Sequence, residues 1–166
     1  MNADYWIQHL KMEKHPEGGF YKSSFVSGDK FEPATHTEPR QFYTSIYFLL
    51  RSQDVSHFHR LKSDELWYFH AGSPLTVHMI DEEGTYRQSK IGLNIEIGES
   101  LQVMVPKGSI FGSTVDQPDD YSLVGCMVSP GFDFADFEFF TQQQLMADYP
   151  QHEKIIKQLA YEKLPE

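Results

Sequence analysis

Short runs rich in aromatic and β-branched residues recur along most of this chain, and their spacing limits the folds available to it. The runs lie at residues 20–26, 42–50, 65–70, 74–80, 100–106 and 121–128. SGD, RSQD, AGSP, DEEG, KGS and QPDD separate them, and residues of these types favour turns. No helical pattern interrupts the series between residues 20 and 128. The pattern predicts an all-β fold, an antiparallel sandwich or barrel.

A short helix and a tight turn are expected before the first of these strands. Residues 3–10 have one apolar side, and Asn2 or Asp4 can cap them as a helix. HPEGG at residues 15–19 predicts a turn, because proline fixes one dihedral angle and glycine accepts positive φ. The same stretch is a candidate for the rim of a ligand pocket.

The C-terminal end combines one more strand pattern with two helical patterns. FDFADFEFF at residues 132–140 alternates and predicts a last strand. Thr141 can cap a helix, and Pro150 can begin another that runs to about Ala160. The second of these helices has one apolar stripe, which we expect to pack on the barrel.

The length of the chain favours a single domain. A chain of 166 residues buries roughly two-thirds of its unfolded surface, and its 40% hydrophobic residues supply a core. We expect one domain over residues 1–166, with the barrel core at about residues 20–140 and C-terminal helices at 141–161.

Charge and cysteine content bound the partners and the location of the protein. The formal net charge of -10 disfavours nucleic acid and anionic membranes as partners. Cys126 is the single cysteine, and its apolar surroundings LVGCMV predict a small buried side chain more than a reactive thiol. The N-terminus has no signal-peptide pattern, and the chain has no long apolar stretch. We expect a cytoplasmic protein.

Two histidines, His57 and His59, form the strongest candidate site. Strand side chains alternate, so both are expected on one face, roughly 6.6 Å apart along the strand. Glu65 on the next strand would add a carboxylate, and two imidazoles with one carboxylate suit Mn, Fe, Ni or Zn. Trp67 and Phe69 share the parity of Glu65 and should line the interior with it. The plain alternative is two half-exposed histidines, hydrogen-bonded at a strand end.

The surroundings of these residues resemble the first motif of the cupin superfamily, whose fold is a small antiparallel jelly-roll barrel, also called a double-stranded β-helix. The His-x-His pair, a carboxylate and the turn glycine Gly72 carry this likeness, and VPKGSIFGS (105–113) resembles the second motif. More specifically, the chain resembles one cupin-like family over about residues 5–150, through HPEGGFYK, TSIYFLL, SHFHRLKSDELWYFHAG, VPKGSIFG and LVGCMVSPGFDFADFE. The resemblance implies a jelly-roll subunit, usually a homodimer, with a pocket inside the barrel. It also implies a distant likeness to metal-free sugar-nucleotide epimerases, although the family has no agreed reaction.

The chain departs from the cupin motifs at two positions that matter for metal binding. The second cupin motif, which VPKGSIFGS resembles, usually supplies a further metal-binding histidine. This chain has Phe111 at that position. The gap from His59 to Glu65 is one residue longer than the motif usually has. Asp64 lies at the usual distance from His59 but not at the usual distance from Gly72. We therefore expect no catalytic metal. The alternative is a divalent metal held by His57, His59 and Glu65.

Three functions stay open on this basis. The first is a metal-free epimerase or isomerase of a sugar or sugar nucleotide, with His57 or His59 as base and Tyr47 or Tyr68 as acid. The second is a metal-dependent cupin enzyme, an oxygenase or isomerase. The third is a protein that binds a small polar or anionic molecule without turnover.

Five further side chains are candidates for ligand binding. Arg40 or Arg60 can hold an anionic group through a bidentate contact. Glu65, Trp67 and Phe111 are expected at the pocket wall. Ordinary strand packing is the better explanation for each candidate tyrosine taken singly, and a solvated surface position explains Arg60 equally well.

Overall fold

The computed structural model describes residues 1–165, and most of its strands belong to two six-stranded sheets. The first sheet has the order β1-β2-β5-β13-β7-β11, and the second has the order β10-β9-β8-β12-β6-β14. The strands of the first sheet are β1 (Glu13–Lys14), β2 (Phe20–Val26), β5 (Thr44–Arg51), β13 (Tyr121–Ser129), β7 (Asp64–Gly72) and β11 (Gln102–Val105). The strands of the second sheet are β10 (Glu99–Ser100), β9 (Tyr86–Ile91), β8 (Leu75–Ile80), β12 (Ile110–Val115), β6 (Val55–Arg60) and β14 (Glu138–Phe139).

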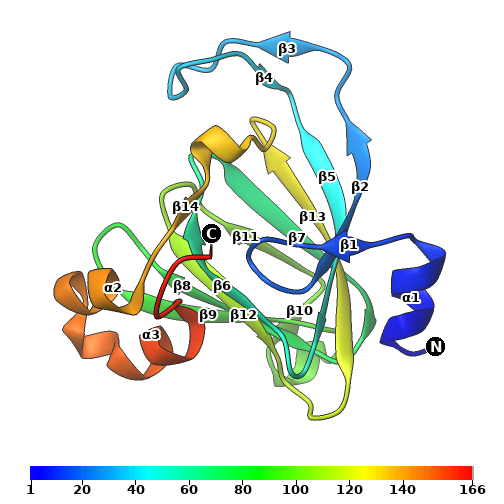
Figure 1. Cartoon of the computed structure of the whole chain (residues 1–166). Helices are drawn as coiled ribbons and strands as arrows, with labels where there is room; N and C mark the ends of the chain where they lie inside the picture. Colours follow the sequence, from blue (N-terminus) through cyan, green and yellow to red (C-terminus); the bar gives the residue numbers. More distant parts are fainter. Residues whose placement is uncertain (166) are drawn as a thin grey trace.

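The two sheets face each other as a jelly roll (Figure 1). Neighbouring strands pair antiparallel, except that β10 runs parallel to β9 over two residues. Hydrogen bonds do not join the sheets into one closed barrel within residues 1–165. The predicted all-β antiparallel jelly-roll fold is confirmed, with the interior lying between two open sheets.

The main core fills the space between the sheets. Phe48, Trp67, Val77 and Phe111 are buried there, and Phe69 packs against them. Trp67 and Phe69 occupy the interior face of β7, as the alternation of that strand predicts. Burial of these large rings supplies much of the apolar area that stabilises the fold.

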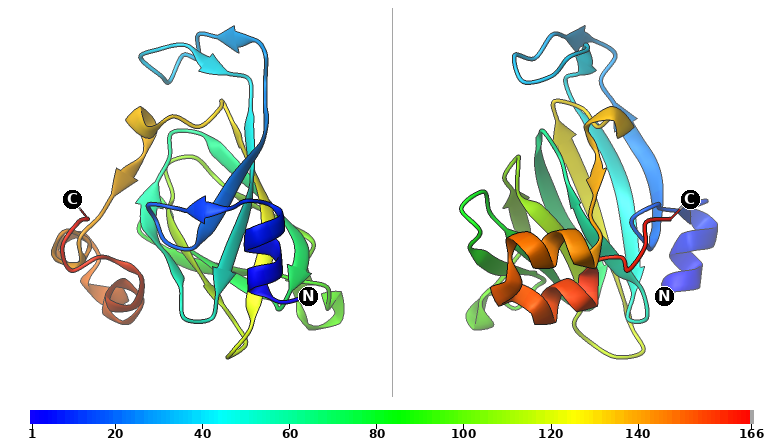
Figure 2. Two further views of the ribbon diagram at one scale, coloured as in Figure 1. Left: turned by 45° about the vertical axis from the view of Figure 1, so that its right-hand side comes forward. Right: turned by 60° about the vertical axis from the view of Figure 1, so that its left-hand side comes forward.

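Short helices cover the outer faces of the sheets (Figure 2). Helices α2 (Gln142–Asp148) and α3 (Glu153–Leu159), joined by the 3-10 helix η3 (Pro150–His152), pack on the second sheet. Phe58 of β6 lies in that outer cluster with Ile156 and Leu159, which confirms the predicted packing of the apolar stripe. Thr141 caps α2 in a capping box, as predicted from the sequence. Helix α1 (Ala3–His9) lies against the first sheet and is capped by Asn2.

Two segments depart from regular strand structure. Residues 132–140 form the 3-10 helix η2 (Phe134–Asp136) followed by the two-residue strand β14, so the predicted long last strand is wrong. The 3-10 helix η1 (Ile95–Ile97) likewise comes directly before a two-residue strand, β10. The ribbon of β3 (Lys30–Phe31) and β4 (Arg40–Gln41) stands beyond the ends of the sheets (Figures 1 and 2). No helix within residues 1–165 has the length and apolar character needed to cross a membrane.

Candidate active site

A cavity of about 210 Å³ lies between the sheets, beside the core. Its deep end is polar, because His59, Glu17 and Glu65 line it and are only 2%, 6% and 7% exposed. Its mouth is apolar, since Val26 and Phe134 line it and are 50% and 59% exposed. The full lining comprises His15, Glu17, Tyr21, Ser23, Val26, Thr44, Ile46, Phe48, His59, Leu61, Glu65, Cys126, Val128, Phe132, Phe134 and Phe137.

The HPEGG turn delivers Glu17 to the deep end of this cavity. Gly18 and Gly19 have φ of 115° and 71°, a backbone region that favours glycine. A Cβ atom at Gly18 would lie 2.0 Å from the Val55 carbonyl oxygen, so a larger residue cannot approach β6 so closely. The expected turn is therefore present, and it lines the deep end of the cavity and not its rim. His15 and Glu17 were not predicted as site residues, although two titratable side chains on either side of a proline in a glycine turn could have suggested them.

Glu17 is the centre of the polar contacts at the deep end. The Ser56 hydroxyl donates to Glu17 Oε1 at 2.8 Å. Glu17 Oε2 lies 3.2 Å from His59 Nε2 and 3.5 Å from His15 Nδ1. One buried carboxyl group therefore contacts both histidines that line the cavity.

The proton positions in this cluster follow from its remaining contacts. His59 Nδ1 lies 2.7 Å from the His57 carbonyl oxygen, which can only accept, so Nδ1 carries a proton. Burial lowers the pKa of His59 to about 4, so at neutral pH its Nε2 is unprotonated and faces Glu17. Burial also raises the pKa of Glu17. Both shifts favour the uncharged forms, so a proton held on Glu17 Oε2 can be donated to the unprotonated Nε2 of His59.

Glu65 is the second carboxyl group of the cavity. Burial raises the pKa of Glu65 well above its ordinary value, and the charge of Glu17 raises it further. The Cys126 thiol and the Trp67 indole oppose this rise, and no basic residue is among the groups that shift the pKa. Burial likewise lowers the pKa of His15. The four titratable side chains at the deep end therefore favour their uncharged forms.

The structure separates His57 from His59, and the predicted convergence of the two rings in one cavity is wrong. Ser56 and His59 both contact Glu17 although they are three residues apart, so the alternation of β6 breaks between them. The cause is a bulge, because β6 advances three residues where the paired strand β12 advances two, at Gly112. The His57 ring lies outside the cavity and stacks on Tyr161 with a centroid separation of 3.7 Å.

His57 has a structural contact in place of the expected ligand contact. Its backbone N–H and its Nδ1 both lie within hydrogen-bond distance of the Glu17 carbonyl oxygen, at 2.8 and 2.7 Å. The Tyr161 hydroxyl donates to the Pro16 carbonyl oxygen at 2.8 Å. His57 and Tyr161 together hold the backbone of the turn that presents Glu17.

The two candidate acids, Tyr47 and Tyr68, do not line the cavity. Tyr47 packs against the outer cluster beneath α1 and lies edge-on to His70. Tyr68 has the strand parity opposite to that of Glu65 and points away from the interior. The prediction that these tyrosines lie beside the histidines is wrong, because both lie on the outer face of the first sheet.

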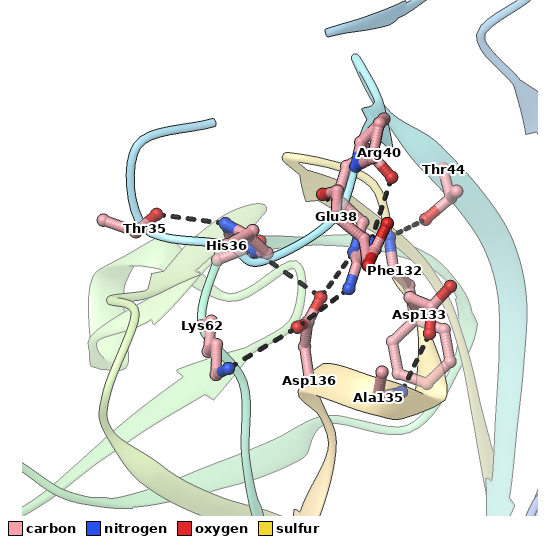
Figure 3. A network of polar contacts seen from close by, with 12 residues as sticks. Thr35, His36, Glu38, Arg40, Thr44, Lys62, Phe132, Asp133, Ala135 and Asp136 are labelled. Atoms are coloured by element: carbon pink, nitrogen blue, oxygen red, sulfur yellow. Dashed lines mark hydrogen bonds and ion pairs between the residues drawn. The ribbon is translucent and has the colours of Figure 1, made fainter. Parts of the chain in front are cut away.

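The two candidate arginines also lie away from the cavity, each paired with a carboxylate. Figure 3 shows Arg40 of β4 reaching Asp136 of η2, with Nε–Oδ2 and Nη2–Oδ1 distances of 2.7 and 3.1 Å. Arg60 donates to Glu138 Oε2 from Nη2 at 2.7 Å, at the surface. Arg40 and Arg60 were expected to bind an anionic ligand, but neither of them lines the cavity.

Two further basic side chains, those of His36 and Lys62, lie close to Asp136 (Figure 3). His36 Nε2 lies 3.5 Å from Asp136 Oδ2, and Lys62 Nζ lies 3.8 Å from Oδ1. Burial alone would raise the pKa of Asp136, but the hydrogen bonds and charge of Arg40, with the charges of His36 and Lys62, lower it. Phe137 follows Asp136 in the chain and lines the cavity. This ion-pair cluster anchors the segment that forms one wall of the site.

The family model described as Cupin superfamily (DUF985) matches residues 4–140. The chain belongs to this cupin family. A protein of Shewanella oneidensis of known structure is 53% identical, with a TM-score of 0.91 over 98% of this chain and 99% of that one. A hypothetical protein of Leishmania major is 47% identical, with a TM-score of 0.93 over 98% of this chain and 100% of that one.

More distant cupins of known structure share the fold alone. Oxalate decarboxylase of Bacillus subtilis is 16% identical, with a TM-score of 0.51 over 86% of this chain and 44% of that one. A cupin 2 domain-containing protein of Halorhodospira halophila is 11% identical, with a TM-score of 0.51 over 91% of this chain and 88% of that one. No curated protein matches the sequence.

The metal donors that the cupin motif suggests do not converge in this chain. His57 lies outside the cavity, while His59 Nε2 and Glu65 face into it. At the position of the further motif histidine, the buried Phe111 ring packs against His59 with centroids 4.1 Å apart. No three His, Cys, Asp or Glu side chains of residues 1–165 are arranged to hold a metal ion. The set of His57, His59 and Glu65 therefore does not fit a metal.

Trp67 and Glu65 are the ligand-binding candidates on β7, and both face the interior. Glu65 lines the cavity, so the register argued from its distance to Gly72 is confirmed. Asp64 instead accepts a hydrogen bond from the Lys107 backbone at 2.8 Å. Trp67 and Phe111 were expected at the pocket wall and lie in the core next to the cavity instead. The Trp67 indole nitrogen is close enough to Glu65 to oppose the rise of its pKa, but it makes no hydrogen bond of good geometry among the described residues.

Proposed function

We propose that this cupin binds a small carbonyl compound between its sheets and moves a proton on it without a metal, as an isomerase or epimerase does. The observation that carries the proposal is the cluster of His15, Glu17, His59 and Glu65 at the deep end of an otherwise apolar cavity. Burial shifts the carboxyl pKa values upward and the imidazole pKa values downward, and perturbed acids and bases of this kind are common at sites that transfer protons.

Glu65 is suited to act as the acid. A carboxyl group that keeps its proton at neutral pH can donate a hydrogen bond to a carbonyl oxygen. Burial raises the pKa of Glu65, which favours its protonated form, and its side chain lines the cavity. In this role, Glu65 would stabilise the negative charge that develops on the ligand oxygen.

The Glu17–His59 pair is suited to act as the base. A proton held on Glu17 can be donated to His59 across a 3.2 Å contact, so the pair can accept a second proton from a ligand. Ser56 holds the other carboxyl oxygen of Glu17, which fixes the orientation of the pair. An acid and a base at one end of a cavity are the minimum equipment for proton transfer beside a carbonyl.

The proposed reaction balances without an added reagent. The Glu17–His59 pair takes a proton from the carbon next to the carbonyl, and the C–H electron pair becomes the C=C bond of an enol. The carbonyl oxygen takes up the proton of Glu65. The Glu17–His59 pair then returns its proton to carbon, and the enol hydroxyl returns its proton to Glu65, which restores a carbonyl group and both protein groups. Delivery to a different carbon completes an isomerisation, and delivery to the same carbon after the enol has turned its other face to the pair completes an epimerisation.

Proton exchange from deuterated water tests this proposal. Cyclohexanone, phenylpyruvate and dihydroxyacetone phosphate would each be incubated with the protein in D2O, and loss of the α-proton signal followed by NMR. We expect faster exchange for at least one compound, reduced about 100-fold or more by Glu17→Gln or Glu65→Gln, since general acid–base groups contribute roughly 10²–10⁴-fold.

Two tyrosine variants provide matched controls. Tyr47→Phe and Tyr68→Phe change aromatic side chains that lie outside the cavity, so exchange should be unchanged. If every compound exchanges no faster with the wild-type protein than with the Glu17→Gln variant, the proposal of proton transfer is wrong.

A second candidate is ligand binding without turnover, and one observation favours it. Burial lowers the pKa of His59 to about 4, which makes its imidazole a weak base. A ligand could then be held by the same polar groups without losing a proton. Binding of a carbonyl compound with no exchange of its α-proton would establish this alternative.

A further inference from the structure

The size of the cavity limits what can occupy it. An engineered protein cavity of about 150 Å³ accommodates benzene. The present cavity, at about 210 Å³, has room for one six-membered ring with a short substituent. A nucleotide does not fit inside, so a larger ligand would insert only one end.

The walls of the cavity favour a flat ring. Tyr21, Phe48, Phe132 and Phe137 line it, and Ile46 and Val128 fill the space between them. Aromatic rings pack face-to-edge or offset on such walls, and this arrangement adds to the free energy gained by burying the ring. A sugar ring would place several hydroxyl groups against these apolar surfaces without hydrogen-bond partners.

The charges around the cavity disfavour an ionised ligand. No lysine or arginine is among the lining residues. Arg40 and Lys62 lie outside the lining, and both contact the Asp136 carboxylate. An anion would therefore be buried beside Glu17 and Glu65 without a counter-charge. A cation would require one of these carboxyl groups to lose the proton that its burial favours.

The deep end still offers a hydrogen-bond donor to an uncharged ligand. Glu17 contacts Ser56 and His59, whereas no basic side chain among the described residues lowers the pKa of Glu65. A protonated Glu65 can donate to a carbonyl or hydroxyl oxygen of the ligand. The exposed apolar mouth, the aromatic walls and this donor lie in that order from the surface inward.

We propose that the part of the ligand that enters the cavity is an uncharged, unsaturated or aromatic single ring, with one oxygen-bearing group directed at Glu65. This inference rests on the proposed function only for placing the ligand in this cavity. It departs from the anionic or sugar-like ligand that the sequence suggested, because the arginines on which that expectation depended lie elsewhere.

Three probes of similar size and different charge test the inference: benzyl alcohol, benzoate and benzylammonium. Binding to the wild-type protein at pH 7.5 would be measured by saturation-transfer NMR and by titration of the protein's amide signals. We expect benzyl alcohol to bind at least tenfold more tightly than either ion. Tighter binding of benzoate or of benzylammonium would overturn the proposal.

Variants locate the probe in the cavity. Ile46→Trp fills the cavity and should abolish binding of benzyl alcohol, whereas Met104→Trp, at an exposed position on β11, should leave it unchanged. Glu65→Gln keeps a donor and should retain binding, whereas Glu65→Leu should weaken it at least fivefold. Amide spectra of each variant would verify folding. Binding that survives Ile46→Trp in a folded protein contradicts the proposal.

The outcome separates the ligand class from the proposed reaction. Tight binding of benzyl alcohol without α-proton exchange in any carbonyl compound would support the ligand class and refute the reaction. Exchange of an anionic compound such as phenylpyruvate, together with tighter binding of benzoate, would support the reaction and refute the ligand class.

Discussion

Two buried carboxyl groups, Glu65 and Asp136, lie on either side of one cavity wall and have opposite electrostatic surroundings. Asp136 accepts two hydrogen bonds from Arg40, and the pKa of its carboxyl group is lowered. No basic side chain among the described residues lowers the pKa of Glu65, and burial raises that pKa well above the ordinary value. Both side chains are nearly inaccessible to solvent, at 8% and 7% exposed, so the basic partners of Asp136 favour its ionised form and the burial of Glu65 favours its protonated form.

The difference shows that the partner of a buried acid decides its role. Asp136 neutralises Arg40 and ties the β4 ribbon to the segment that carries Phe132 and Phe137. Glu65 costs stability when it ionises, and groups with strongly shifted pKa values are common at functional sites. One carboxyl group therefore builds the wall of the site, and the other is available to a ligand.

The largest expected effect comes from removing the charge of Asp136. Asp136→Asn should lower the free energy of unfolding by about 3–5 kcal/mol, because Arg40 is left buried without its counter-charge. Urea denaturation at pH 7 measures the loss. Because the folded-state pKa of Asp136 is lowered, the stability it contributes is present above the ordinary carboxyl pKa and lost as pH falls through the lowered value.

A double variant provides the control for Asp136. Arg40→Met with Asp136→Leu removes both charges and should recover most of the loss, since an apolar pair replaces a buried ion pair at little cost. A loss below about 1 kcal/mol for Asp136→Asn would place this pair among weak surface contacts and break the comparison with Glu65.

Glu65→Gln should have the opposite sign and a smaller size. The raised folded-state pKa means that wild-type protein loses stability as pH rises from the ordinary carboxyl pKa toward the folded-state value. The variant lacks this loss, so it should gain up to about 1.4 kcal/mol relative to wild type per pH unit in that window. Denaturation at pH 5 and pH 8 measures the difference, and a variant equally destabilised at both values would contradict it.

Tyr161→Phe should have a further, smaller effect that concerns the presentation of Glu17. Loss of the hydrogen bond from the Tyr161 hydroxyl to the Pro16 carbonyl oxygen should cost about 0.5–1.5 kcal/mol in the free energy of unfolding. The ring stays stacked on His57, so the fold should persist. The NMR signal of the His59 ring should shift, since Glu17 contacts it, and an unchanged signal would argue against this support of the turn.

The smallest effect is expected at the exposed pair of Arg60 and Glu138. Both side chains are well exposed, at 39% and 53%. Glu138→Gln should change the free energy of unfolding by only about 0–1 kcal/mol, because solvent screens the pair. A loss as large as that of Asp136→Asn, measured by the same denaturation, would mean that burial does not separate the two arginine pairs.

The sequence predicted the parts of this structure that depend on local pattern. Alternation placed Glu65, Trp67 and Phe69 on one face of β7, and Thr141 began a helix as expected. The prediction that His57 faces the cavity was wrong because alternation assumes a regular strand. The bulge opposite Gly112 shifts the side chains by one residue.

The remaining site residues depend on contacts between distant parts of the chain. Glu17 reaches His59 only because two glycines let the turn approach β6, and the pattern HPEGG shows the turn without its partner. Arg40 and Asp136 are 96 residues apart, so no local pattern could show that this arginine was already paired. Such pairings decide which polar residues are available to a ligand.

The most direct measurement of the central claim is infrared difference spectroscopy of the carboxyl groups at pH 7. Wild-type protein should show carbonyl-stretch absorption of protonated carboxylic acid that shifts in D2O, and Glu65→Gln should remove a component that Glu17→Gln leaves in place. Asp136→Asn should leave that component in place, because Asp136 is ionised. A wild-type spectrum without such a component, or with a component that persists in Glu65→Gln and disappears in Asp136→Asn, would contradict the account of Glu65 as a protonated group of the cavity.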